Sequence, residues 1–239
     1  MKFNSQRFLV LYSGVLTAVF AVTVLSGFVK SPQKATFEEI DVQRINLREA
    51  DGTLRLVINS AGKAPGIIIK GKEYPHPDRK AAGMIFFNDE GTENGGLIFG
   101  GEKNADGSKE SHGHLSFDAY EQDQTMALSS HQVGNKRSSS LVFTDYPDYS
   151  ILQDIQFMAS IKDLSKDQQK ARWAAYQQEH GKPATRMVLG RDPDNSVALS
   201  MSDEAGHPRI VMKVAPDGSP SLQMLDEHGK VTGELVPKK

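Results

Sequence analysis

Two histidines are the first side chains whose spacing could bind a metal ion. His112 and His114 form a His-x-His pair, and a strand would place both rings on one face, where imidazole nitrogens could hold Zn²⁺. Two ligands do not complete a site, and the remaining histidines are scattered along the chain. The favoured interpretation is that these are solvated loop histidines, and no metal is expected.

An acidic, glycine-rich loop at 88–96 offers a second candidate. The carboxylates of Asp89, Glu90 and Glu93 could wrap Ca²⁺. Their spacing departs from that of an EF-hand loop, which needs alternating oxygen ligands, a glycine at its sixth position and a glutamate at its twelfth. A hairpin turn between two apolar strands is the simpler interpretation.

Enzyme signatures are missing from the sequence. It has no G-x-S-x-G elbow, no Walker loop, no H-E-x-x-H and no Rossmann fingerprint. The chain has no cysteine, which excludes thiolate nucleophiles, disulfides and cysteine-ligated metals. A net charge of −2 over 239 residues offers no basic field for nucleic acid. The sequence therefore favours a non-catalytic protein without catalytic residues, cofactors or nucleic-acid partners.

One long apolar run is expected to anchor the rest of the chain to a membrane. The segment from Phe8 to Val29 has no charged side chain, and as a helix it would be about 33 Å long, enough to cross a lipid bilayer. Signal-peptide cores are usually about 7–15 residues long, and this run also lacks an A-x-A-like cleavage site. We therefore expect an uncleaved transmembrane helix. The expected parts are an amino-terminal segment at 1–7, the helix at 8–29, a linker at 30–36 and a soluble domain at 37–239.

Charges around the apolar run favour one orientation. Lys2 and Arg7 precede the run and Lys30 and Lys34 follow it, so basic side chains alone are balanced. All 30 acidic residues lie beyond residue 30. This asymmetry predicts a cytoplasmic amino terminus and an extracytoplasmic soluble domain.

The carboxyl-terminal part of the chain contains an internal repeat. Residues 186–206 align with 209–229 without a gap, at an offset of 23 residues. In each copy two apolar residues lie two positions apart, which is strand spacing with one buried face. These pairs are Leu199-x-Met201 and Leu222-x-Met224. Each unit is therefore predicted to contain two strands and two turns.

Turn residues separate the predicted strands of the repeat. An aspartate can accept hydrogen bonds from nearby backbone N–H groups, and a glycine can adopt positive φ. The structural turn positions are Asp203, Gly206, Asp217, Gly218, Asp226 and Gly229.

Weaker copies of the unit lie upstream. The spacing from Ile45 to Ile58 agrees with that from Leu199 to Met212. Polar insertions lengthen the later copies, and we expect them to be surface loops that carry recognition. The insertions lie at 71–82, 101–113 and 131–140.

One segment, 165–180, departs from the strand pattern and is predicted to be a helix. Ser165 and Gln168 form a capping box at its start. Trp173 and Tyr176 lie on one side of this helix, where they would pack on the sheet and cover an edge or, alternatively, form a docking face.

The turns also predict the architecture. Tight turns after short strands connect antiparallel neighbours, whereas a solenoid pairs parallel strands. The predicted fold is all-β: an antiparallel meander of two-strand repeats closed into a barrel, prism or propeller-like body, with one transmembrane helix and one short soluble helix. A β-solenoid is the alternative.

Four stretches of the chain resemble a group of bacterial membrane proteins known mainly as uncharacterised. They lie at 37–46, 65–77, 86–101 and 113–118. The sequence FNDEGTENGGLIFGG at 87–101 is the distinctive part. The resemblance implies a bacterial source and a single amino-terminal span, and hence a single-pass inner-membrane protein with a periplasmic domain. It implies no activity and no catalytic residue.

Two classes of function remain. The first is a membrane-anchored β-repeat module that acts as an interaction or scaffold protein of the bacterial envelope, with an unknown protein partner or as a homo-oligomer. The second is an envelope enzyme or carbohydrate-binding protein with a site in the insertions at 71–114. A deep pocket lined by the acidic loop and the His-x-His pair would favour the second. The first is preferred because repeats specify a surface more readily than a pocket.

Overall fold

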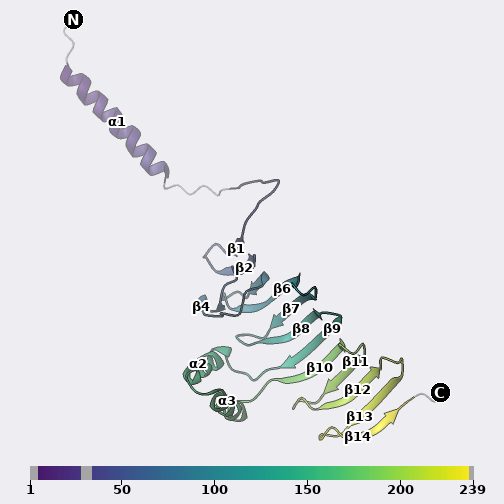
Figure 1. The fold of residues 1–239 in the computed structure, drawn as a ribbon. Helices are drawn as coiled ribbons and strands as arrows, with labels where there is room; N and C mark the ends of the chain where they lie inside the picture. Colours follow the sequence, from purple (N-terminus) through teal and green to yellow (C-terminus); the bar gives the residue numbers. More distant parts are fainter. Residues whose placement is uncertain (1–4, 28–33, 237–239) are drawn as a thin grey trace. The chain divides into compact units, whose positions relative to one another are not determined.

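The computed structural model describes residues 5–27 and 34–236 of the chain (Figure 1). It divides into two compact units, Met1–Asp41 and Val42–Lys239. Parts of several predicted segments lie outside the described residues. These are 1–4 of the amino-terminal segment, 28 and 29 of the predicted span, 30–33 of the linker and 237–239 of the soluble domain.

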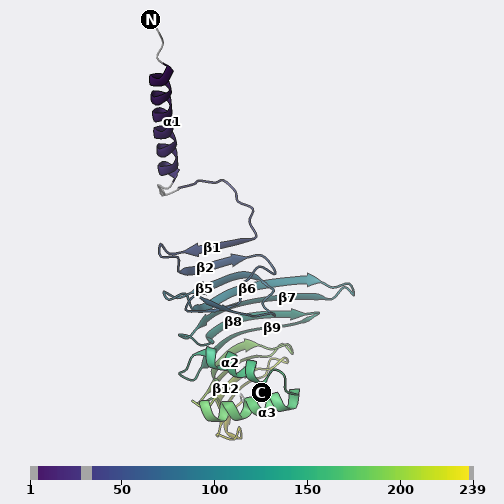
Figure 2. The same ribbon diagram turned by 90° about the vertical axis from the view of Figure 1, so that its left-hand side faces the viewer.

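The second unit is built on an open, twelve-stranded antiparallel sheet (Figures 1 and 2). Its strands lie side by side in chain order, with β1 and β14 at the two edges. The strands are β1 (Arg44–Arg48), β2 (Leu54–Asn59), β5 (Ala82–Phe87), β6 (Glu93–Lys103), β7 (Lys109–Asp118), β8 (Gln124–Val133), β9 (Lys136–Asp145), β10 (Ala184–Arg191), β11 (Val197–Ser202), β12 (Pro208–Val214), β13 (Pro220–Leu225) and β14 (Val231–Leu235).

The predicted antiparallel meander is confirmed, but its predicted closure is wrong. The strand order has two free edges, so the sheet is not a barrel, prism or propeller-like body. The β-solenoid is wrong as well, because the paired strands of this sheet run antiparallel. Each tight turn places a strand beside the strand before it. Turns of this kind build a single layer, and they do not bring the two edge strands together.

The predicted two-strand repeat is confirmed at the carboxyl end, where β10 pairs with β11 and β12 with β13. The turns after β11 and β13 share one bonding pattern: Gly206 N donates to Asp203 O, and Gly229 N donates to Asp226 O. Gly206 and Gly229 have φ values of 82° and 78°. The Oδ1 atoms of Asp203 and Asp226 each accept two backbone N–H bonds. The side chains chosen from the sequence therefore shape these turns.

The turn between β12 and β13 is built in a similar way. Gly218 has a φ of 86° and its N–H donates to Ala215 O. Asp217 Oδ1 accepts the N–H of Ser219 at 2.9 Å, and this bond holds the pKa of Asp217 below its usual range.

Gly229→Val is expected to lower the free energy of unfolding by about 1–2 kcal/mol, because a β-branched residue resists positive φ. No described atom lies within 4 Å of the Cβ that the substitution adds, so backbone strain alone causes the loss. Urea unfolding measures it. Gly113→Val is the matched control, since Gly113 has equally open space but lies in β7. Equal losses in both variants would contradict the turn assignment.

An excursion between β2 and β5 covers one face of the sheet. Residues 60–81 leave the sheet, form a two-stranded hairpin from β3 (Ile67–Ile69) and β4 (Lys72–Tyr74), and return to β5. We call the covered side, which carries Val57 and Ile85, the hairpin face. The opposite side, which carries Leu56 and Phe86, is the open face. The buried core lies under the hairpin and consists of Leu54, Val57, Ile68, Ile85 and Phe87.

Two of the three predicted polar loops are strands instead. In place of a loop at 101–113, β6 and β7 stay paired as far as Lys103 and Lys109. In place of a loop at 131–140, β8 and β9 stay paired as far as Val133 and Lys136. These strand ends are polar because they extend beyond the buried core. Their polar composition is also typical of surface loops, and this is why the sequence predicted loops.

Two helices, rather than the one predicted, lie between β9 and β10. Helix α3 (Lys166–His180) confirms the predicted helix, including the capping box of Ser165 and Gln168. Helix α2 (Ile151–Ile161) is absent from the prediction, because its short apolar sequence suits a strand equally well.

Trp173 and Tyr176 pack against α2. The ring centroids of Tyr176 and Phe157 are 4.2 Å apart, and those of Trp173 and Phe157 are 6.0 Å apart. These rings join the two helices, a contact that could not be predicted without α2.

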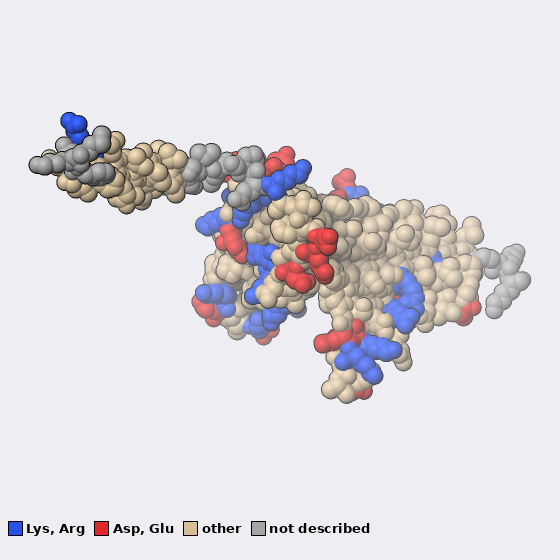
Figure 3. Space-filling model, turned by 90° about the horizontal axis from the view of Figure 1, so that it is seen from above, with Lys and Arg blue, Asp and Glu red and all other residues tan. Residues whose placement is uncertain are grey.

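The first unit contains the apolar helix α1 (Ser5–Gly27). Residues Ser5–Leu25 have a mean hydropathy of 2.3. Figure 3 shows a helix surface without charged side chains apart from a basic one near its amino-terminal end. A helix of this length and composition fits a membrane span, and its place near the amino terminus also fits a signal peptide.

Candidate functional site

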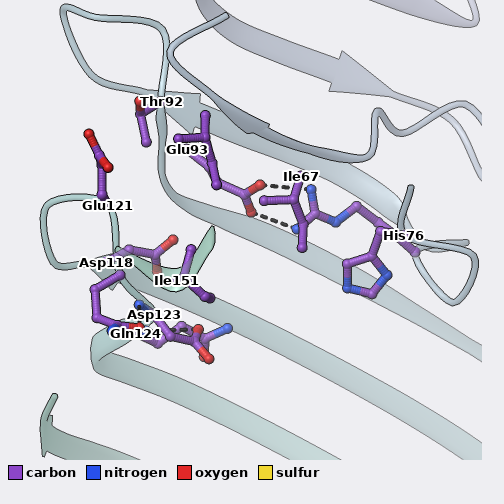
Figure 4. Close-up of a pocket in the computed structure, with 12 residues that line it drawn as sticks. Ile67, His76, Thr92, Glu93, Asp118, Glu121, Asp123, Gln124 and Ile151 are labelled. Carbon is purple, nitrogen blue, oxygen red and sulfur yellow. Dashed lines mark hydrogen bonds and ion pairs between the residues drawn. The ribbon is translucent and has the colours of Figure 1, made fainter. Parts of the chain in front are cut away.

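A small pocket lies between the excursion and the hairpin face (Figure 4). Its volume is about 210 Å³, and its walls come from the hairpin, β6, the turn between β7 and β8, and the start of α2. An adjoining hollow of about 220 Å³ shares His76, Arg79, Glu93 and Gln124 with it and extends to His114. The two hollows together form one concave site beneath the excursion.

A charged pair connects the excursion to the sheet at this pocket. Arg79 donates to Glu93 through Nη1 to Oε2 at 2.9 Å and through Nη2 to Oε1 at 2.6 Å. Both side chains are 16% exposed. Arg79 Nη1 also donates to Gly66 O at 3.0 Å. Because both side chains are largely buried, this bidentate ion pair holds the end of the excursion against β6.

A second ion pair lies at the same pocket. Lys70 Nζ is 2.5 Å from Glu121 Oε1. The hydrogen bond with Lys70 lowers the pKa of Glu121 and, reciprocally, raises the pKa of Lys70. Ile151 N donates to Glu121 O at 2.7 Å. The hairpin, the turn after β7 and the start of α2 are therefore linked through one residue.

Asp118 is the titratable group of the pocket whose ionisation is most strongly perturbed. Burial, followed by the negative charges of Glu93 and Asp123, raises the pKa of Asp118 to about 7, although Arg79 opposes this. Its Oδ1 atom is buried without a hydrogen-bond partner among the described residues. Burial, with Asp123 and Asp118 nearby, also raises the pKa of Tyr146 to about 12. The pocket therefore holds a carboxyl that gains a proton near neutral pH.

Asp118→Asn is expected to remove a pH dependence of stability. The folded chain binds this proton up to about pH 7, whereas the unfolded chain loses it near its ordinary pKa of 3.8. The folded state therefore holds more protons between these values, and stability falls as pH rises through this window. Between pH 5 and pH 8, wild type should lose on the order of 1 kcal/mol relative to the variant in urea unfolding. The exposed Asp148→Asn should behave as wild type, and an unchanged profile for Asp118→Asn would contradict the raised pKa.

The acidic loop does not bring its three candidate residues to one ion. Asp89 pairs with Arg55, Glu90 accepts a hydrogen bond from Tyr120, and Glu93 binds Arg79. Glu93 alone among them lines the two hollows. The simple hairpin-turn interpretation holds for this loop, since Asn88 Oδ1 accepts from the backbone N–H groups of Glu90 and Thr92.

His112 and His114 lie in β7 and not in a loop, because β7 extends through the predicted insertion. The ring of His112 lies over Gly100, whose added Cβ would be 2.6 Å from His112 Cε1. His114 Nδ1 is 2.8 Å from Ser129 Oγ. Strand register also places His131 opposite His112, which sequence spacing did not reveal. Within residues 5–27 and 34–236, no group of three metal-ligating side chains could hold an ion.

The open face carries two apolar rows that cross the whole sheet. The hydrogen-bond register places one residue of every strand in each row. Row one contains Leu47, Leu56, Phe86, Gly95, Phe117, Met126, Phe143, Met187, Met201, Ile210, Met224 and Gly233. Row two contains Ile45, Ile58, Met84, Leu97, Leu115, Leu128, Leu141, Leu189, Leu199, Met212, Leu222 and Leu235. Neither row includes a polar or charged side chain.

Apart from Gly95, no residue of these rows is buried within the described part of the chain. Leu128 and Met224 are 54% and 52% exposed, whereas Val57 on the hairpin face is 0% exposed. The repeat pairs, such as Leu199 and Met201, belong to these rows. The predicted buried face of the repeat is therefore wrong for a single copy, because the sheet has one layer and nothing described covers this side.

Comparison with known proteins adds no functional assignment. No family model matches the chain, and no curated protein matches it significantly. The resemblance of the stretch at 87–101 to bacterial membrane proteins therefore stays a prediction. The chemistry of the pocket and of the open face has to carry the functional argument.

Proposed function

We propose that this chain is a membrane-anchored β-repeat module that acts as an interaction or scaffold protein of the bacterial envelope. The open face is the observation that carries this proposal. Strands about 4.8 Å apart, with same-face residues about 6.8 Å apart, give the two rows an area of about 700 Å². The largest apolar patch on an ordinary monomer is about 300–600 Å² and often functional. The proposed docking surface for a partner is therefore the open face of the sheet and not the polar loops.

The proposal places α1 in the bacterial inner membrane, with the amino terminus in the cytoplasm and the sheet in the periplasm. The length and hydropathy of α1 support a span, and the position of all 30 acidic residues beyond residue 30 supports the orientation. The protein should stay in the membrane pellet after alkaline carbonate extraction. Its recovery in the supernatant would contradict the anchor.

The pocket supports an enzyme or carbohydrate-binding site less well. Arg79 and Glu93 bond to each other and so are not offered to a ligand. Asp89 and Glu90 lie outside both hollows. These observations favour the interaction module, and the proposal includes no catalytic step.

The experiment compares charges placed on the two faces of β11. Leu199 lies in row two, and Ser200 is the next residue, on the hairpin face. The full-length protein in mild detergent should migrate in a complex larger than a monomer on native electrophoresis. Leu199→Asp should release the monomer, because an unpaired charge in an apolar interface costs several kcal/mol. Ser200→Asp should retain the complex.

Both variants should keep the circular dichroism of wild type, since neither position is buried. A wild-type protein that migrates as a monomer would contradict the proposal. A complex that survives Leu199→Asp would exclude the open face as its docking surface.

A further inference from the structure

The open face has the size of one side of a protein dimer interface. The area of its two rows, about 700 Å², approaches the roughly 800 Å² that each partner buries in a standard complex. Its composition also fits the centre of such an interface, which is depleted in charged residues and enriched in aromatic residues and methionine. Row one supplies Phe86, Phe117, Phe143 and several methionines.

The open face is complementary to itself. A two-fold interface brings one patch against an identical patch, so a charged patch would meet its own sign. The rows have no charged side chain along the full order of twelve strands. Since apolar side chains occupy the rows apart from two glycines, opposing rows can pack whichever way the second sheet runs.

A second sheet would supply the layer that this fold lacks. Domains bury a sheet face against another layer, and two sheets pack about 10 Å apart with interdigitating side chains. On the hairpin face the excursion buries Val57, Ile85 and Phe87. The open face has no such layer in the described chain, although its residue pattern is that of a buried face.

We propose that the occupant of the open face is the open face of a second copy of this chain. The inference rests on the proposed function and names its partner. The two sheets form a sandwich whose two-fold axis passes near Leu128 and Leu141, the row-two residues of the two middle strands. Leu128 then lies close to its own counterpart, whether the axis runs along the strands or across them.

The test uses a single cysteine, which is possible because the chain has none. Full-length Leu128→Cys, made with two different epitope tags in the same cells, is treated in native membranes with a short bis-maleimide. A crosslinked dimer that carries both tags is expected. Ser129→Cys, the next residue on the hairpin face, is the matched control and should give no dimer. A dimer from both variants would overturn the proposal, since it would reflect collision.

Labelling with a mono-maleimide separates the remaining outcomes. If Leu128→Cys gives no dimer and reacts freely, the open face is uncovered, and both this inference and the proposed function fail. If it gives no dimer and is protected, a lipid or a different protein covers the face. The second copy is then excluded; the interaction module stands if a protein covers the face and fails if lipid does.

Discussion

Arg79→Ala is expected to lower the free energy of unfolding by about 3 kcal/mol, as measured by urea unfolding. Arg79 makes two hydrogen bonds to Glu93 and one to Gly66, and it is largely buried. Its removal leaves the Glu93 carboxylate unpaired in a pocket that also contains Asp118, and an uncompensated buried charge is strongly destabilising. The pKa of Asp118 should rise further, because Arg79 lowers it in the wild type.

Two variants control this result. Arg55→Ala removes an arginine whose two partners, Glu49 and Asp89, are exposed, and should cost less than about 1 kcal/mol. The double variant Arg79→Leu with Glu93→Leu should recover part of the loss, because no unpaired charge remains. A loss for Arg79→Ala no larger than that for Arg55→Ala would mean that the pair does not hold the excursion.

Gly95→Ala is expected to lower the free energy of unfolding by about 3 kcal/mol or more. Gly95 has a φ of 130°, and an added Cβ would lie 2.3 Å from Ser116 O. Both the strain and the overlap involve backbone, so no side-chain rotation relieves them. Thermal unfolding measures the loss. Gly113→Ala, whose added Cβ meets no described atom within 4 Å, should leave the midpoint nearly unchanged. Similar midpoints for the two variants would contradict the close approach of β6 and β7.

The local elements were predictable because their causes lie within a few residues. The turn from Asp203 to Gly206 contains both the carboxylate that accepts backbone N–H bonds and the glycine with positive φ. The capping box of α3 is equally local. Whether the sheet closes was not predictable in this way, because closure depends on whether β1 and β14 meet. The sequence of a single turn does not determine the shape of the whole sheet.

The pocket could not be predicted from spacing. Arg79, Glu93 and Asp118 lie on three different segments, and only the pairing of β5, β6 and β7 brings them together. The same holds for His131, which register places opposite His112. The sequence offered Glu93 only as a weak candidate ligand of Ca²⁺, whereas in the structure its carboxylate pairs with Arg79.

The open face was visible in the sequence but was misinterpreted. The spacing of Leu199 and Met201 correctly predicts residues on one side of a strand. We expected that side to face the core of a closed body. The structure has one layer, so the same pattern describes an exposed apolar surface instead.

Thiol protection along β11 in native membranes tests the central claim most directly. Single cysteines at Ala198, Leu199, Ser200 and Met201 alternate between the two faces, and none of these positions is buried in one chain. If the open face is an occupied interface, maleimide should label positions 198 and 200 rapidly and positions 199 and 201 at least about tenfold more slowly, which corresponds to about 1.4 kcal/mol of protection. Equal labelling at all four positions would contradict an interface on the open face.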